Sequence, residues 1–162
     1  FALSINGENV TFGMSDQELT TLYPDVYWDP WFEEDPHSGT LIFSGGATEI
    51  DTLTATDVTL QVDRNNSLGQ PKLTLVSASL PTGDNCISAF KDALAVLTQQ
   101  HGQPDYDPFG MECVRIYQAN GTLSATWTTD EVTISLSLNR MFDENLSLDY
   151  MYLLNYDAGD LN

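Results

Sequence analysis

Basic side chains are scarce in this sequence. Lys and Arg total 5 against 24 Asp and Glu residues, which gives a formal net charge of −19. A surface with so few cations repels the phosphate backbone of nucleic acids and the headgroups of anionic lipids. We therefore expect no nucleic-acid partner. Three explanations of the acidity remain open: solubility in a salty or crowded exterior, attraction to cations or a basic partner, and imitation of nucleic-acid charge.

Long apolar runs are missing too. No segment approaches the ~20 apolar residues that cross a bilayer, so we expect no transmembrane segment. The sequence starts at Phe1 rather than at Met, which suggests that an export leader, or a leader carrying a lipid anchor, has been removed. A length of 162 residues is usual for one domain. We expect a monomeric single domain over residues 1–162, with halves over about 1–83 and 84–162.

Cysteine is limited to Cys86 and Cys113. Such a pair fits one structural disulfide, and two buried free thiols are the alternative. Disulfides persist in oxidising compartments. Together with the inferred leader, the pair predicts an extracytoplasmic location, which includes secreted, periplasmic and cell-surface proteins.

Two segments carry helix signals. Ser15 and Glu18 have the spacing of a capping box, and Pro24 ends the short helix that follows. A second helix begins near residues 84–85 and ends in His101–Pro104 (HGQP), where Gly takes the cap position. We expect His101 to be a cation that interacts with the helix dipole.

Alternating apolar and polar residues predict the strands. They lie at Ser4–Phe12, Thr40–Phe43, Ala47–Asp51, Asp57–Asp63, Lys72–Leu80, Val114–Gln118, Thr122–Thr128, Val132–Leu138 and Leu146–Leu154. A change of phase between Leu75 and Val76 predicts a bulge or a strand covered on both faces, and Asn120-Gly121 predicts a type I′ hairpin. Each half then has a helix followed by about four strands. The fold class that follows is α+β, with two helices packed on one face of a long antiparallel sheet in pseudo-duplicated halves.

A strand-to-helix junction at Val10–Leu19 (VTFGMSDQEL) resembles the "FGM(T/S)" junction of β-lactamase inhibitor proteins and of small outer-membrane-assembly lipoproteins. His101–Pro104 resembles the "YGxP" helix ending that many exported bacterial proteins carry after that junction. The resemblance implies an exported scaffold with a binding role. Unlike the inhibitor, this chain has one such junction and one cysteine pair, so no inhibitory residue is carried over.

Enzyme motifs are mostly absent. The sequence has no Gly-rich phosphate loop, no G-x-S-x-G elbow, no H-E-x-x-H and no CxxC pair. We predict neither a cofactor nor a metal site, and whether the protein is an enzyme stays open. The alternative to a binding protein is a carboxylate-dependent hydrolase, in which one buried acid with a raised pKa works beside a second carboxylate.

One segment, Tyr27–Ser38 (YWDPWFEEDPHS), combines aromatic rings with carboxylates. Its two prolines predict an irregular loop. Rigid rings and carboxylate acceptors suit a protein partner or a sugar ring, and the alternative is that the rings belong to the core. The predicted binding residues are Tyr27, Trp28, Trp31, Phe32, Glu33, Glu34 and Asp35, together with Tyr106 from a second loop of similar chemistry. The favoured function is an exported, non-enzymatic binding or envelope-associated protein with a protein or glycan ligand.

Overall fold

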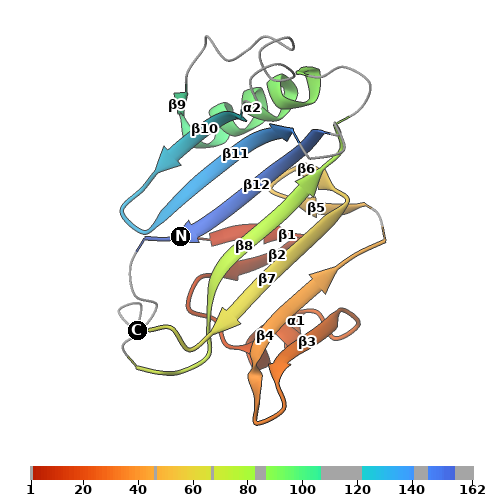
Figure 1. Cartoon of the computed structure of the whole chain (residues 1–162), viewed down its shortest axis with the longest axis vertical. Coiled ribbons are helices and arrows are strands. Elements are labelled where there is room, and N and C mark those ends of the chain that lie inside the picture. Colours follow the sequence, from red (N-terminus) through yellow and green to blue (C-terminus); the bar gives the residue numbers. More distant parts are fainter. Residues whose placement is uncertain are drawn as a thin grey trace.

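An antiparallel sheet of eight strands forms the larger part of the computed structural model, which describes residues 2–45, 47–66, 68–82, 87–106, 122–140 and 146–155. Its strand order is β3 (Tyr27–Phe32), β4 (Asp35–Phe43), β7 (Asp57–Asp63), β8 (Lys72–Leu80), β12 (Leu146–Leu154), β11 (Val132–Arg140), β10 (Thr122–Thr128) and β9 (Asp105–Tyr106) (Figure 1). Within the same ranges, a second sheet has the order β2 (Glu8–Thr11), β1 (Ala2–Ile5), β5 (Thr48–Ile50) and β6 (Leu53–Ala55). The helices there are α1 (Asp16–Leu22) and α2 (Ser88–His101).

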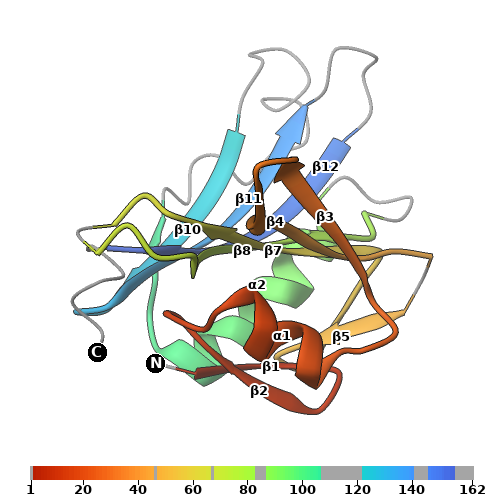
Figure 2. The ribbon, with the colours of Figure 1, turned by 90° about the horizontal axis from the view of Figure 1, so that it is seen from below.

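The elements form two layers. Figure 2 shows α1, α2 and the small sheet on one side of the large sheet, and no other described element covers the opposite, open face. Helix α1 contacts β4, and α2 contacts β11. Along β7, Val58, Leu60 and Val62 are fully buried while the residues between them are not, which is the period of a strand with one face in the core. The core therefore lies between the two layers.

The expected α+β class is wrong. The structure is mostly β, with 55% of the described residues in strands and 17% in helices. The second layer contains a sheet as well as helices, and the two halves do not repeat, because β5 and β6 leave the large sheet whereas β9 to β12 all join it. The physical reason is burial: α1 has only 7 residues, and the hairpins β1–β2 and β5–β6 supply fully buried side chains such as Ile5 and Ile50 to the same core.

Alternation located the central strands correctly. β7, β8, β10 and β12 have the predicted bounds, and β11 continues to Arg140. β8 has a bulge close to the expected place: the register with β7 skips Thr74, whereas the change of phase in the sequence lies between Leu75 and Val76. The expected strand Val114–Gln118 and the Asn120-Gly121 turn lie outside the described residues.

Two segments form hairpins that the sequence patterns did not predict. Ser4–Phe12 is not one strand, since the chain turns at Asn6 and Gly7 with φ of 49° and 82°, the geometry that Asn-Gly favours. Tyr27–Ser38 is not an irregular loop, since it contains β3 and the start of β4. Pro30 fits within β3 because this strand is at the edge of the sheet, where proline is tolerated.

The marked helix ends are confirmed. Ser15 Oγ accepts a hydrogen bond from the Glu18 N–H at 3.2 Å, and Glu18 Oε2 accepts one from the Ser15 N–H at 2.8 Å. Helix α1 ends before Pro24, and α2 ends at His101 with Gly102 as its cap residue, whose φ is 87°. The expected start of α2 near residues 84–85 lies outside the described residues. Neither described helix is long and apolar enough to span a membrane.

Candidate functional site

Three exposed aromatic side chains lie on the edge strand β3. Tyr27 is 64% exposed, Trp31 41% and Phe32 53%; we call these three residues the aromatic patch. The other large apolar side chains exposed in the described part of the chain, Leu68 and Leu153, lie on different segments. Single exposed apolar residues are ordinary, whereas a group of them marks a contact surface.

The register between β3 and β4 determines which rings face solvent. Trp28 lies opposite the fully buried Leu41, so its ring is on the core side, and its Nε1 donates to the Pro36 carbonyl at 3.0 Å. Tyr27 lies opposite Ile42 and therefore on the open side. Trp28 is half-buried and packs against the core, so it is separated from the aromatic patch.

A bulge positions the remaining two rings of the patch. The register of β3 against β4 shifts between Pro30 and Phe32. Trp31 Nε1 donates to Thr40 Oγ1 at 3.0 Å. This hydrogen bond holds the indole beside β4 on the surface, so Trp31 is fixed in place although it is exposed.

Gly39 allows β3 and β4 to approach each other. A Cβ atom at this position would lie 2.2 Å from the Asp29 carbonyl oxygen. Any other residue would therefore push the strands apart. The patch depends on this close pairing, because Gly39 lies opposite Pro30 in the middle of β3.

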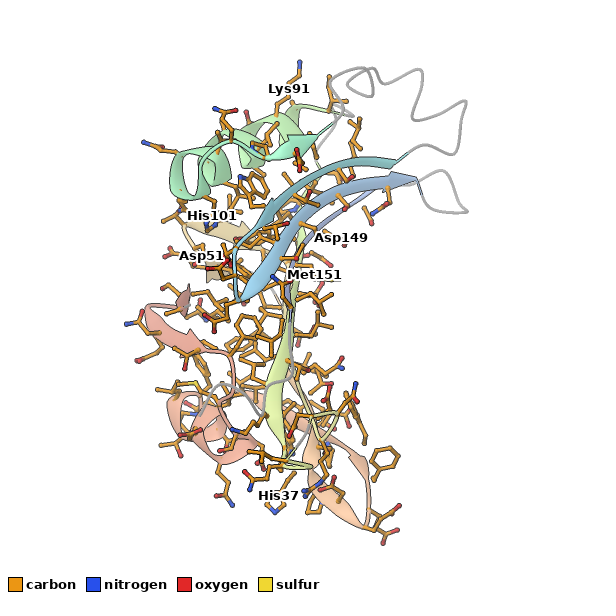
Figure 3. All side chains as sticks on the ribbon, turned by 90° about the vertical axis from the view of Figure 1, so that its left-hand side faces the viewer. His37, Asp51, Lys91, His101, Asp149 and Met151 are labelled. Carbon is orange, nitrogen blue, oxygen red and sulfur yellow. The ribbon has the colours of Figure 1, made fainter. Side chains whose placement is uncertain are left out.

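The patch borders the open face of the large sheet. One row of register partners starts at Tyr27 and crosses seven strands: Tyr27, Ile42, Thr59, Ser77, Met151, Ser135 and Thr126. Beyond Tyr27, four of the other six carry aliphatic hydroxyl groups, and those of Thr59 and Ser77 share a hydrogen bond at 2.7 Å. Figure 3 shows Asp149 and Met151 on the side of the sheet away from Asp51 and His101. The patch is thus an aromatic border on a largely polar surface.

Asp35, the residue of β4 next to the turn of the β3–β4 hairpin, forms an ion pair. Arg64 donates from Nε to Oδ2 at 2.7 Å and from Nη2 to Oδ1 at 2.9 Å, and Ser38 Oγ donates to Oδ2 at 2.6 Å. The hydrogen bonds from Arg64 and then from Ser38 hold the pKa of Asp35 well below its ordinary value. A general acid requires the opposite shift. Asp35 therefore does not fit the acid of the hydrolase hypothesis.

The remaining predicted site residues are dispersed. Glu33 and Glu34 form the turn between β3 and β4 and are exposed. Tyr106 belongs to β9, at the edge of the large sheet opposite to β3, so it does not join the aromatic patch. Cys86 and Cys113, the predicted disulfide, lie outside the described residues.

A buried network that the sequence patterns did not predict joins the two sheets. Tyr150 and Tyr152 on β12 both donate to Asp51 Oδ2, Tyr150 at 3.1 Å, and their hydroxyl groups contact each other. Asp51 Oδ1 accepts from the Ser4 N–H at 2.9 Å. Burial raises the pKa of both tyrosines, and the negative charge of Asp51 raises it further. The available signal was the spacing of the tyrosines, because alternate residues of a strand share one face.

His101 lies beside this network. Its ring centroid is 6.4 Å from that of Tyr152 and 6.0 Å from that of Trp127. Burial lowers the pKa of His101, and the charge of Asp51 opposes this shift only in part. His101 lies in the last turn of α2 as expected, but the lowered pKa favours the neutral imidazole over the expected cation.

The turn between β5 and β6 is strained. Ile50 and Leu53 are paired, and the two residues between them, Asp51 and Thr52, have φ of 48° and 74°. Both angles suit Gly or Asn, whereas a β-branched residue is disfavoured there. Thr52 compensates in part, because Gln100 Nε2 donates to its Oγ1 at 3.0 Å.

Replacing Thr52 by Gly is expected to raise the free energy of unfolding by about 1 kcal/mol, because relief of the left-handed strain exceeds the loss of one exposed hydrogen bond. The matched control is Thr54→Gly in the regular part of β6, which is expected to lower stability by about 1 kcal/mol. Urea denaturation measures both. Equal destabilisation by the two changes would show that Thr52 is not strained.

Within the described residues, no group of three or more His, Cys, Asp or Glu side chains is placed to hold a metal ion. The geometry therefore leaves the aromatic patch as the candidate for recognition and the Asp51 network as a structural link between the sheets. Comparison with models of protein families, with curated proteins and with solved structures found no match.

Proposed function

We propose that this protein is a non-enzymatic binding protein and that the aromatic patch of β3 is its contact surface. The observation that carries the proposal is the exposure of Tyr27, Trp31 and Phe32 together on one strand. Tyr and Trp are the residues most enriched at the energetic centres of protein interfaces. Trp31 is also held by Thr40, so little side-chain freedom is lost when a partner covers it.

The mode of binding is through side chains rather than strand addition. β3 is an edge strand, and an exposed edge can pair with a strand from another protein. Pro30 lacks an N–H group and the register shifts next to it, so the free edge offers no regular ladder. A partner would therefore contact the rings of the patch.

We also propose that the protein acts outside the cytoplasm, as an exported or envelope-associated protein. The cysteine pair and the resemblance of Val10–Leu19 to exported proteins support this location. Mass spectrometry of an unreduced digest of protein purified from its own host tests it. A peptide that joins Cys86 to Cys113 is expected, and two unmodified thiols would contradict the proposal.

The binding proposal is tested with a displayed random-peptide library and a panel of immobilised glycans. Wild-type protein is compared with Tyr27→Ala/Trp31→Ala/Phe32→Ala and with the control Leu68→Ala/Leu153→Ala, which also removes exposed apolar area. We expect wild type and control to retain a common set of ligands that the patch variant loses, although all three melt at similar temperatures. Ligands retained by all three proteins, or none for any, would contradict the proposal.

A further inference from the structure

We propose that the partner of the aromatic patch is a basic protein segment that presents arginine side chains; this inference rests on the proposed function. It names the chemistry of the partner, which the exposure of the rings alone does not. Negative charges surround the patch, and free positive charges are missing from the described residues near it.

The cations whose side chains the structure describes, Arg64, Lys72 and Lys91, are not available at the patch. Arg64 is held by both oxygens of Asp35 and by the Gly69 carbonyl, to which it donates at 2.9 Å. Lys72 is buried, with 6% of its surface exposed. Lys91 is on α2, and Figure 3 shows it at the end of the molecule opposite to His37 of β4. A cationic partner would therefore meet no competing cation from these residues.

Carboxylates lie within the patch and next to it. Asp29 is on β3 between Tyr27 and Trp31, opposite Thr40, the residue that accepts the Trp31 hydrogen bond. Glu33 and Glu34 follow Phe32 directly and are exposed. Among the described residues, none of these three carboxylates forms an ion pair, in contrast to Asp35.

Rings and carboxylates at one surface match the chemistry of a guanidinium group. Its planar face stacks on Trp or Tyr through cation–π attraction, while its N–H groups donate to carboxylates. Lysine has the same charge but lacks the planar face and the fork of donors. The net charge of −19 favours the same partner at long range, because it attracts a basic segment before contact.

The test uses an oligo-arginine peptide, an oligo-lysine peptide of equal length and an uncharged Gly-Ser peptide, titrated at physiological salt. A highly acidic protein binds polycations without specificity, so matched variants are essential. Trp31→Ala/Tyr27→Ala tests the rings. Glu33→Gln/Glu34→Gln tests the carboxylates, and Glu49→Gln/Asp92→Asn changes the net charge equally in the second layer.

We expect Trp31→Ala/Tyr27→Ala, the ring variant, to bind oligo-arginine about tenfold more weakly than wild type does. We expect wild type to bind the oligo-lysine peptide several-fold more weakly than oligo-arginine. Glu33→Gln/Glu34→Gln is expected to weaken binding several-fold, and Glu49→Gln/Asp92→Asn by less than about twofold. Equal effects of the two charge variants, with no effect of the ring variant, would overturn the inference.

Two further outcomes separate this inference from the proposed function. In the first, the patch variant Tyr27→Ala/Trp31→Ala/Phe32→Ala loses glycans or library peptides that lack Arg and Lys, while the ring variant binds oligo-arginine as wild type does. The basic partner is then wrong and the binding role stands. If no ligand depends on the patch, both fail.

Discussion

Replacing Asp51 by Ala is expected to lower the free energy of unfolding by about 3 to 5 kcal/mol. The carboxylate accepts hydrogen bonds from the Tyr150 and Tyr152 hydroxyls and from the Ser4 N–H. A buried donor that loses its acceptor costs about 1 to 3 kcal/mol, and the two hydroxyls can still contact each other. The loss is large because one side chain links the turn of the small sheet to β12 of the large sheet. Urea denaturation at neutral pH measures it.

Asp51→Asn is the matched control for that change. Asparagine tolerates the φ of 48° at this position and keeps one carbonyl acceptor. We expect it to lose about half as much stability as the Ala variant. If Ala and Asn cost the same, the negative charge rather than the geometry of the acceptors stabilises the network; if neither costs more than about 1 kcal/mol, the network does not hold the sheets together.

Raising the pH from about 10 to about 11 is expected to remove about 2 kcal/mol of stability through Tyr150 and Tyr152. Burial and Asp51 raise the pKa of both groups above the value of 10.0 that tyrosine has in the unfolded chain. Below pH 10 both states are protonated and the contribution is complete. Above it, only the unfolded chain releases protons, so stability falls by up to about 1.4 kcal/mol per pH unit for each tyrosine.

The Tyr152→Phe variant separates this effect from general alkaline damage. It removes one of the two titrating groups of the Asp51 network, while Tyr23, whose pKa burial also raises, is present in both proteins. Its stability is therefore expected to decline less steeply above pH 10, although it is less stable than wild type at neutral pH. Denaturation curves at pH 7, 10 and 11 give both quantities. An identical decline in the two proteins would show that Tyr152 does not titrate with a raised pKa in the folded state.

Local chemistry made parts of the fold predictable. The capping box at Ser15 and the glycine at 102 each satisfy backbone groups within one helix, so the sequence alone determines them. The period of two located β7, β8, β10 and β12 because each has one face in the core. These features need no knowledge of distant contacts.

Features that depend on neighbouring strands were not predictable in the same way. Pro30 argued for a loop, and only the position of β3 at the sheet edge makes a strand compatible with it. Asp51-Thr52 lacks the Gly or Asn of a tight turn, and its geometry is held by contacts with Ser4, Tyr152 and Gln100. The small sheet depends on contacts of this kind between distant segments, and its presence changes the fold class from the expected one.

The candidate site was predictable in composition but not in arrangement. The density of rings and carboxylates in Tyr27–Ser38 singled out the segment. The register with β4 then assigned Trp28 to the core side and Tyr27 to the open side. Asp35 became part of an ion pair because Arg64, 29 residues later in the sequence, reaches it across the sheet.

Trp31 belongs to an accessible contact surface, and acrylamide quenching of tryptophan fluorescence tests whether its indole is open to solvent. Trp127 is buried and Trp28 half-buried, so Trp31→Phe is expected to remove most of the quenchable emission and Trp28→Phe much less. If Trp31→Phe instead leaves the quenchable emission unchanged, the indole is shielded from solvent, and the aromatic patch does not exist as a contact surface.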